Sequence, residues 1–171
     1  EEARSYERPL HERLERLIRP SGFYRQKAAR LRSLASHVVS EYGGEVTIML
    51  DPDVDVLRVE LLCLPGIGPE TADSIILFAA GKPKFVAAAY VTRILSRTGV
   101  FPDAGYYQVQ GFVERTVPSD VATYRELYAI LVDHARTLCQ REPICSLCVL
   151  ADQCQYAITS GRRRCCPPRL L

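Results

Sequence analysis

The stretch Leu64–Ala72, with the sequence LPGIGPETA, constrains the fold more than any other part of this chain. Apolar residues recur at three- and four-residue spacing both before it and after it, which predicts a helix on each side. The two apolar faces consist of Val54, Leu57, Leu61 and Leu64, and of Ala72, Ile75, Ile76 and Ala79. The sequence therefore predicts two helices joined by a short glycine turn.

Local signals set the limits of this predicted helical hairpin at residues 51–81. Asp51-Pro52-Asp53 offers an N-cap, a proline at the first helical position and an acid in the first turn. Gly81 stands where a C-terminal cap belongs.

The turn itself, Gly66-Ile67-Gly68, suits an anion. Two glycines permit positive φ and a close approach of the backbone to an outside group. The N–H groups that follow open a helix, whose positive end favours negative charge. The pattern predicts a site for one nucleic-acid phosphate, read without base contacts. The alternative is a turn that serves packing alone.

The remaining patterns predict an all-α chain. Four further segments show helical patterns without strand alternation: Leu10–Ile18, a helix that ends at Gly43-Gly44, one over 88–97 and one over 106–113. The segment Val46-Thr47-Ile48 is predicted to be extended, but it is too short to form a sheet. Thr123 with Glu126 predicts a capping box for the helix that leads to Cys139. Net charge is only +2 in 171 residues, so a nucleic-acid site must come from local clusters. Such a cluster opens the helix near residue 25 and consists of Arg19, Arg25, Lys27, Arg30 and Arg32.

Four of the seven cysteines lie within sixteen residues, spaced C-x5-C-x2-C-x5-C: Cys139, Cys145, Cys148 and Cys154. Four thiolates this close are typical of one metal centre. Zinc and disulfide pairing are the alternatives, and the second does not fit a reducing compartment. Cys63 is expected in the core, while Cys165 and Cys166 belong to a basic, proline-rich tail.

Taken together, LPGIGPETA and the loop CQREPICSLCVLADQC resemble the helix-hairpin-helix glycosylases of the endonuclease III (HhH-GPD) superfamily, over roughly residues 10–156. The resemblance implies the helix-hairpin-helix glycosylase fold, double-stranded DNA containing a damaged base as partner, and a [4Fe–4S] cluster on the four cysteines. The first gap of the loop is one residue shorter than in the best-known members. The DNA-binding residues are expected to be Leu64, Gly66, Ile67, Gly68, Thr71, Arg25 and Lys27.

The catalytic positions depart from the family pattern. Excision of a base needs a carboxylate that opposes the positive charge developing on the sugar. The family Asp falls on Ala88, at a predicted helix start where an N-cap acceptor is expected. The chain is either a natural non-catalytic relative or a catalytically silenced form of an active enzyme. The pocket residue two positions on falls on Tyr90, for which a core position is the alternative.

A second departure concerns the lysine with which bifunctional members form an imine. Its position is Glu70, which has no amine, so the resemblance implies a monofunctional enzyme. The Gly-Ile-Gly-x-Glu pattern and the short cysteine spacing resemble the 3-methyladenine glycosylase III type, which suggests an alkylated base. Glu70 also suits a helix dipole, and a substitute catalytic acid is a further alternative.

The sequence therefore predicts a monofunctional base-excision DNA glycosylase, inactive at Ala88. A non-catalytic damage reader or architectural DNA-binding protein is the alternative. We expect a helical lobe over residues 1–120, a last helix and cluster loop over 121–156, and a basic tail over 157–171. No run approaches the ~18 apolar residues of a membrane span, and the first twenty residues are charged throughout. We expect a cytoplasmic monomer, associated with the nucleoid if the source is prokaryotic.

Overall fold

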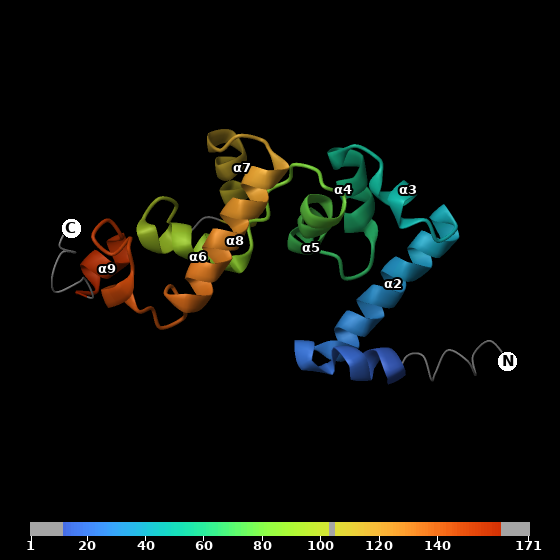
Figure 1. Ribbon diagram of the computed structural model, residues 1–171, viewed down its shortest axis with the longest axis horizontal. Helices are drawn as coiled ribbons and strands as arrows, with labels where there is room; N and C mark the ends of the chain where they lie inside the picture. Colours follow the sequence, from blue (N-terminus) through green and yellow to red (C-terminus); the bar gives the residue numbers. More distant parts are fainter. Residues whose placement is uncertain (1–11, 103–104, 162–171) are drawn as a thin grey trace. The chain divides into compact units, whose positions relative to one another are not determined.

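The computed structural model describes residues 12–102 and 105–161, and it is helical with no strand in these ranges (Figure 1). Residues 12–18 form a helix that leads into η1 (Arg19–Ser21). The elements that follow are α2 (Tyr24–Tyr42), α3 (Val46–Leu50), α4 (Val54–Cys63), α5 (Pro69–Ser74), η2 (Ile75–Ala79), α6 (Ala89–Thr98), α7 (Tyr106–Thr116), α8 (Val121–Thr137), η3 (Cys145–Leu147) and α9 (Gln155–Thr159). The predicted all-α class is confirmed. Within the described ranges, no helix has the length and apolar character that crossing a membrane requires.

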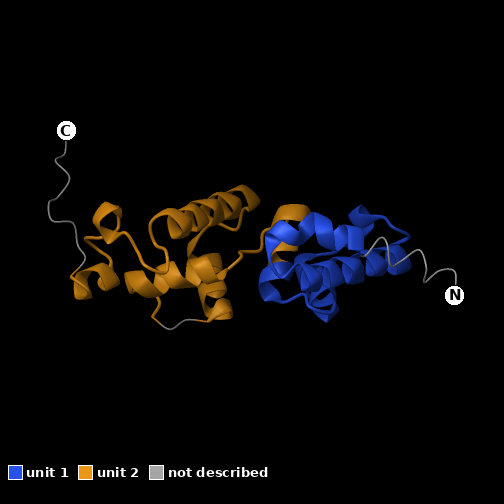
Figure 2. Cartoon of the chain, turned by 90° about the horizontal axis from the view of Figure 1, so that it is seen from below, with its two compact units in different colours: residues 1–72 blue, residues 73–171 orange. Residues whose placement is uncertain are grey.

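The chain divides into two compact units, residues 1–72 and 73–171 (Figure 2). The division falls inside α5 and differs from the boundary near residue 120 expected from the sequence. The reason is that α8 packs against α6, so the last long helix shares one unit with the helices that precede it. The tail predicted from residue 157 is still helical up to Thr159, and residues 162–171 lie outside the described part.

In unit 1, the glycine signals place the end of α2 correctly. Gly43 adopts a left-handed conformation with φ 60°, and its N–H bonds the carbonyl of Val38. The segment Val46–Ile48, expected to be extended, instead belongs to the short helix α3. Burial of Met49 against the unit explains the difference, because packing overrides the weak local preference of β-branched residues.

The predicted apolar face of α4 is confirmed, while its start needs a correction. Leu57 and Leu61 are fully buried, and Leu64 is buried just beyond the helix. Asp53 is the N-cap and makes no side-chain capping bond, so Pro52 precedes the helix instead of occupying its first position.

In unit 2, α5 continues into a wider π turn, η2, before the chain leaves the helix at Gly81 with φ 62°. A π turn exposes carbonyls that the regular ladder does not use. Arg125 of α8 satisfies them: its guanidinium donates to Leu77 O at 2.8 and 3.1 Å and to Phe78 O at 3.1 Å.

The core of unit 2 lies where residues 85–91 meet α7 and α8. It is made by Leu77, Phe85, Val86, Ala87, Ala88, Val91, Val109, Val113 and Tyr124. Phe85 contacts Tyr124 edge to face, with ring centroids 5.7 Å apart. The predicted capping box at Thr123 is wrong, because the N-cap of α8 is Asp120, which accepts from Thr123 N at 2.8 Å. This backbone hydrogen bond lowers the pKa of Asp120.

Candidate nucleic-acid interface and cysteine loop

The turn between α4 and α5 exposes its glycines and buries its apolar residues. Leu64 and Ile67 pack into the unit, and Ile67 N bonds Leu64 O at 3.1 Å. Gly66, Gly68 and the predicted contact residue Thr71 are exposed. The turn therefore presents backbone, anchored by two apolar side chains, which is the arrangement predicted for phosphate.

The two glycines differ in conformation. Gly66 has φ 80°, and a Cβ atom there would lie 2.8 Å from Cγ and Nε of Arg30. Gly68 does not have positive φ, and a Cβ atom there would meet nothing within 4 Å. The expectation that both glycines serve positive φ is thus wrong for Gly68. The space above Gly68 is open, and the cationic side chain beside the turn belongs to Arg30.

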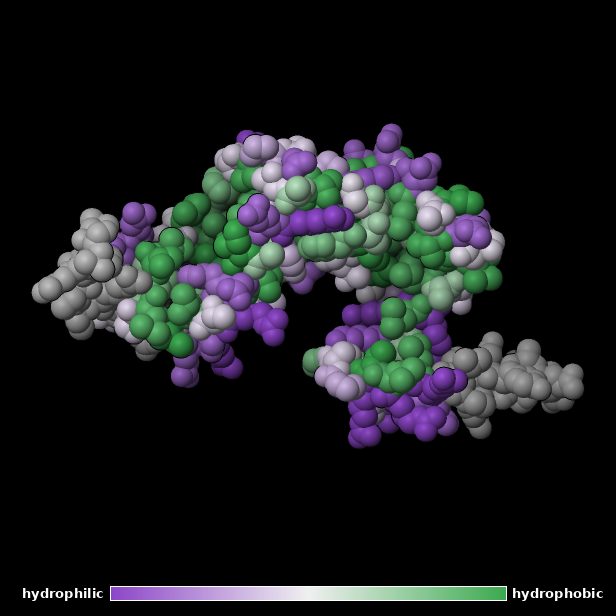
Figure 3. Space-filling view, in the orientation of Figure 1, coloured by the Kyte–Doolittle hydropathy of each residue, from purple (hydrophilic) through white to green (hydrophobic). Residues whose placement is uncertain are grey.

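The start of α2 presents cations and an exposed aromatic ring. Arg25 is exposed and lies 5.7 Å from the ring centroid of Tyr24, whereas Lys27 donates to Ser21 O. Phe23 is 81% exposed and has φ 48°, a conformation that costs a bulky residue energy. The segment before α2 shows a small hydrophobic patch framed by hydrophilic residues (Figure 3). Sequence patterning missed Phe23, since nothing local marks a strained, exposed aromatic residue.

Ala88 is the N-cap residue of α6, as predicted, and no side chain caps the helix there. Its carbonyl accepts from Val91 N at 2.8 Å and Thr92 N at 3.1 Å. The Ala88 side chain is fully buried in the core of unit 2. This position of the chain therefore offers a methyl group and no carboxylate.

Tyr90 and Glu70 both lie at the surface. Tyr90 is 41% exposed, with the guanidinium of Arg93 5.4 Å from its ring centroid, so a core role is wrong. Glu70 lies exposed in the first turn of α5, where a carboxylate favours the positive helix end.

The four cysteines of the predicted metal site line one pocket in unit 2, together with Arg97 and His134. Cys145 is buried beside Ala151 and Ala157. In the part of the chain that the structure describes, no three His, Cys, Asp or Glu side chains form a group that could hold a metal ion. Four cysteine thiolates are the ligands of both tetrahedral zinc sites and iron–sulfur clusters. An all-thiol donor set in an apolar pocket fits iron–sulfur chemistry.

Arg97 of α6 ties the first turn of this cysteine loop to the helix. Its guanidinium donates to Gln140 O at 2.5 Å, to Arg141 O at 3.0 Å and to Cys139 Sγ at 3.4 Å. Cys154 Sγ lies 3.2 Å from the carbonyl of Arg97, and Cys148 Sγ lies 3.7 Å from His134 Nε2.

The cysteines outside this loop do not join it. Cys63 is exposed, so its predicted core position is wrong: it lies on the face of α4 opposite Leu57 and Leu61. Cys165 and Cys166 lie outside the described residues.

Comparison with known proteins agrees with this arrangement. A protein of Methanocaldococcus jannaschii described as a DNA repair glycosylase is 39% identical over 84% of this chain and 66% of its own length. Endonuclease III of Thermotoga maritima is 30% identical over 85% of this chain and 64% of its own length. The chain thus spans about two thirds of the length of these relatives.

Solved structures resemble the chain in the same way. A non-covalent endonuclease III–DNA complex matches with a TM-score of 0.72 and 27% identity, over 90% of this chain and 68% of that one. A Helicobacter pylori 3-methyladenine DNA glycosylase bound to 1,N6-ethenoadenine matches with a TM-score of 0.64 and 25% identity, over 74% and 63%. The family described as HhH-GPD superfamily base excision DNA repair protein matches residues 3–119. The chain belongs to this superfamily.

Proposed function

We propose that this chain is a monofunctional DNA glycosylase scaffold that holds damaged duplex DNA. With alanine at position 88, it releases no base. The observation that carries the proposal is the buried methyl group of Ala88 at the α6 N-cap, where the family resemblance requires a carboxylate. Without that negative charge, nothing at this position opposes the cation that develops on the sugar. Ground-state binding does not require it.

The DNA contacts of the proposal come from unit 1. The exposed turn backbone at Gly66 and Gly68, with Arg30 beside it, suits one phosphate. Arg25 and Lys27 extend the positive charge along α2. Phe23 is exposed and held at positive φ, and we propose that it inserts between unstacked bases, as apolar wedges do in bent duplexes.

Substrate class, chemistry and cofactor are parts of the same proposal. Glu70 has no amine, which supports base release without strand cleavage. The 3-methyladenine glycosylase among the structural relatives supports an alkylated purine as the lesion, with Tyr90 at its pocket. A [4Fe–4S] cluster on Cys139, Cys145, Cys148 and Cys154 would hold the cysteine loop against α6. We propose that the protein acts as a monomer in the cytoplasm.

A damage reader without catalysis is the second candidate function. The burial of Ala88 among apolar side chains favours this second function, because desolvation would make a charged carboxylate at position 88 energetically unfavourable.

The substitution Ala88→Asp separates the two functions. Single-turnover base release from duplexes with alkylated, deaminated or oxidised bases is measured beside a binding titration on the same duplexes. Release gained by Ala88→Asp, absent from the unsubstituted chain and from the control Ala89→Asp one residue along, supports the glycosylase scaffold. No release with binding intact supports the reader. Release by the unsubstituted chain would contradict both proposals and transfer the catalytic role to another carboxylate, such as Glu70.

A further inference from the structure

The connection from η2 to α6 is buried without being regular. Residues 81–88 form neither helix nor strand, yet the side chains of Phe85, Val86, Ala87 and Ala88 are at most 1% exposed. Buried backbone N–H and C=O groups need hydrogen-bond partners. The adjoining helices bond Lys82 N and Ala88 O at the two ends of this connection, while Phe85 lies between those ends.

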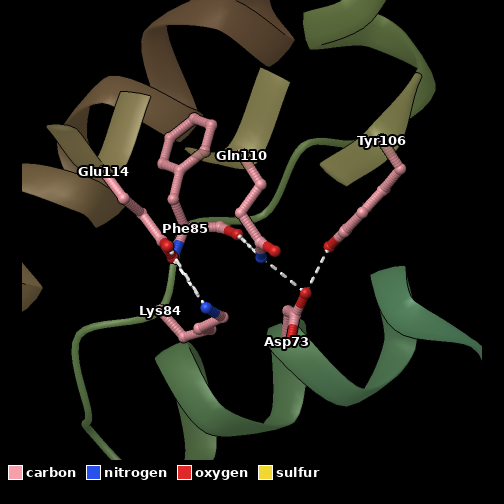
Figure 4. A network of polar contacts seen from close by, with 6 residues as sticks. All are labelled: Asp73, Lys84, Phe85, Tyr106, Gln110 and Glu114. Carbon is pink, nitrogen blue, oxygen red and sulfur yellow. Dashed lines mark hydrogen bonds and ion pairs between the residues drawn. The ribbon is translucent and has the colours of Figure 1, made fainter. Parts of the chain in front are cut away.

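Two side chains of α7 bind both backbone polar groups of Phe85 (Figure 4). Gln110 Nε2 donates to Phe85 O at 2.6 Å, and Glu114 Oε1 accepts from Phe85 N at 3.1 Å. Gln110 and Glu114 are four residues apart and so lie on one face of the helix. The two side chains thus hydrogen-bond the backbone N–H and C=O of Phe85, as a neighbouring strand would in a sheet. Glu114 also pairs with Lys84 Nζ at 3.2 Å, which secures the residue before Phe85.

Asp73 of α5 fixes the orientation of Gln110. The carboxyl group is fully buried, and its Oδ2 accepts from Gln110 Nε2 at 2.7 Å and from Tyr106 OH at 2.7 Å. Because the carboxyl and the Phe85 carbonyl are both acceptors, the amide nitrogen of Gln110 must face both of them. Asp73 thus selects the one amide orientation that bonds Phe85.

We propose that Gln110, oriented by Asp73, is a positioning residue that fixes the backbone at Phe85 and thereby the place where α6 starts at Ala88. This inference rests on the proposed function, in which position 88 belongs to the catalytic carboxylate. Only Val86 and Ala87 separate the fixed residue from that position. A displacement at Phe85 is therefore passed to Ala88 with little room for compensation, in a core that is packed on all sides.

The decisive variant is Gln110→Glu, which keeps the shape of the side chain and removes both hydrogen-bond donors. It also brings a second carboxyl group beside Asp73, which favours repulsion or a shared proton over contact with the Phe85 carbonyl. The matched control is Gln108→Glu, since Gln108 is exposed on the same helix and only accepts, from Gly105 N at 2.7 Å. A second variant, Glu114→Leu, removes the acceptor of Phe85 N at a partly exposed site.

The direct measurement is amide hydrogen exchange in the folded protein. We expect the Phe85 amide to lose about tenfold or more of its protection in Gln110→Glu and in Glu114→Leu. Amides in the middle of α8 should keep their protection in both variants, and Gln108→Glu should match the unsubstituted chain throughout.

The second measurement combines the variants with Ala88→Asp. Base release should fall about tenfold or more with Gln110→Glu, while the dissociation constant for the same duplex stays within about twofold. Unchanged Phe85 protection in both variants would overturn the proposal, and so would an equal loss across α8, which indicates general loss of core stability. Release unchanged despite a freed Phe85 would overturn it as well. If Ala88→Asp releases no base in any background, the proposed function fails, and the exchange data alone decide whether Gln110 fixes Phe85.

Discussion

At the scale of single residues, the two glycines of the turn between α4 and α5, Gly66 and Gly68, have different structural roles. Gly66 supplies a left-handed backbone and leaves room for the Arg30 side chain. Gly68 does not have positive φ, and a Cβ atom there would meet no described atom within 4 Å. A side chain at Gly68 would extend into open space outside the turn, and this makes Gly68 the sharper test of phosphate binding.

The variant Gly68→Val should therefore fold normally but bind DNA poorly. Its Cβ atom meets no protein atom, so the free energy of unfolding should fall by no more than about 1 kcal/mol, the difference between glycine and valine at a helix start. Duplex affinity should fall for any sequence, because the added methyl groups occupy the space of the phosphate. Fluorescence anisotropy titrations at two salt concentrations, with urea unfolding as the control, measure both effects. Normal affinity would show that the turn serves packing alone.

Glu70 gives a second prediction at this scale, because an imine needs an amine. Borohydride should trap no covalent complex between abasic DNA and this chain, even in the Ala88→Asp background. Adding Glu70→Lys in that background supplies the amine and should produce a trapped adduct, seen as a slower band in a denaturing gel. An adduct without Glu70→Lys would mean that another lysine, such as Lys82 or Lys84, reaches the sugar.

At the scale of elements, α2 and α4 are joined by a polar contact. Glu60 of α4 accepts from Tyr42 OH at 2.6 Å, and its Oε1 lies 2.6 Å from Nε2 of His37, also on α2. Burial raises the pKa of Glu60, but the hydrogen bonds from His37 and Tyr42 outweigh it and bring the pKa below its ordinary 4.5. The same hydrogen bond to Glu60 raises the pKa of Tyr42.

The polar contact between α2 and α4 should therefore weaken in acid. A carboxyl group with a lowered folded pKa contributes stability that is complete above pH 4.5 and lost as the pH falls through the folded pKa. Glu60→Gln should lower the free energy of unfolding by about 1 kcal/mol at neutral pH, and this difference should shrink below pH 4.5. Urea unfolding over a pH series measures it, with Glu41→Gln on the exposed side of α2 as control. A difference that stays constant down to the lowest pH would contradict the role of the charge.

At the scale of the whole molecule, the prediction concerns metal content. Protein purified without air should contain iron and sulfide in about the four-to-four ratio of one cluster per chain. Cys145→Ser should lose iron, since Cys145 is a buried member of the cysteine pocket. Cys63→Ser should retain it, since Cys63 is exposed on α4. Zinc without iron would contradict the proposed cluster.

The sequence by itself determined the features that depend on near neighbours. The all-α class, the apolar face of α4 and the end of α2 at Gly43 follow from periodicity or from one residue's backbone freedom. The grouping of the four cysteines in one pocket was likewise predicted, from their close spacing in the sequence. In each case the relevant physical chemistry acts within a few residues.

Only the tertiary structure decided which side chains meet across the chain. The residues that bond Phe85 lie 25 and 29 positions away, Asp73 lies 37 positions from Gln110, and Arg30 reaches Gly66 from a different helix. The exposure of Cys63 and Tyr90, the strain at Phe23 and the helix at Val46–Leu50 also depend on packing. Burial and hydrogen bonding are settled by whatever surface the folded chain brings opposite a residue. No local pattern records that surface, because it does not exist until the helices have packed.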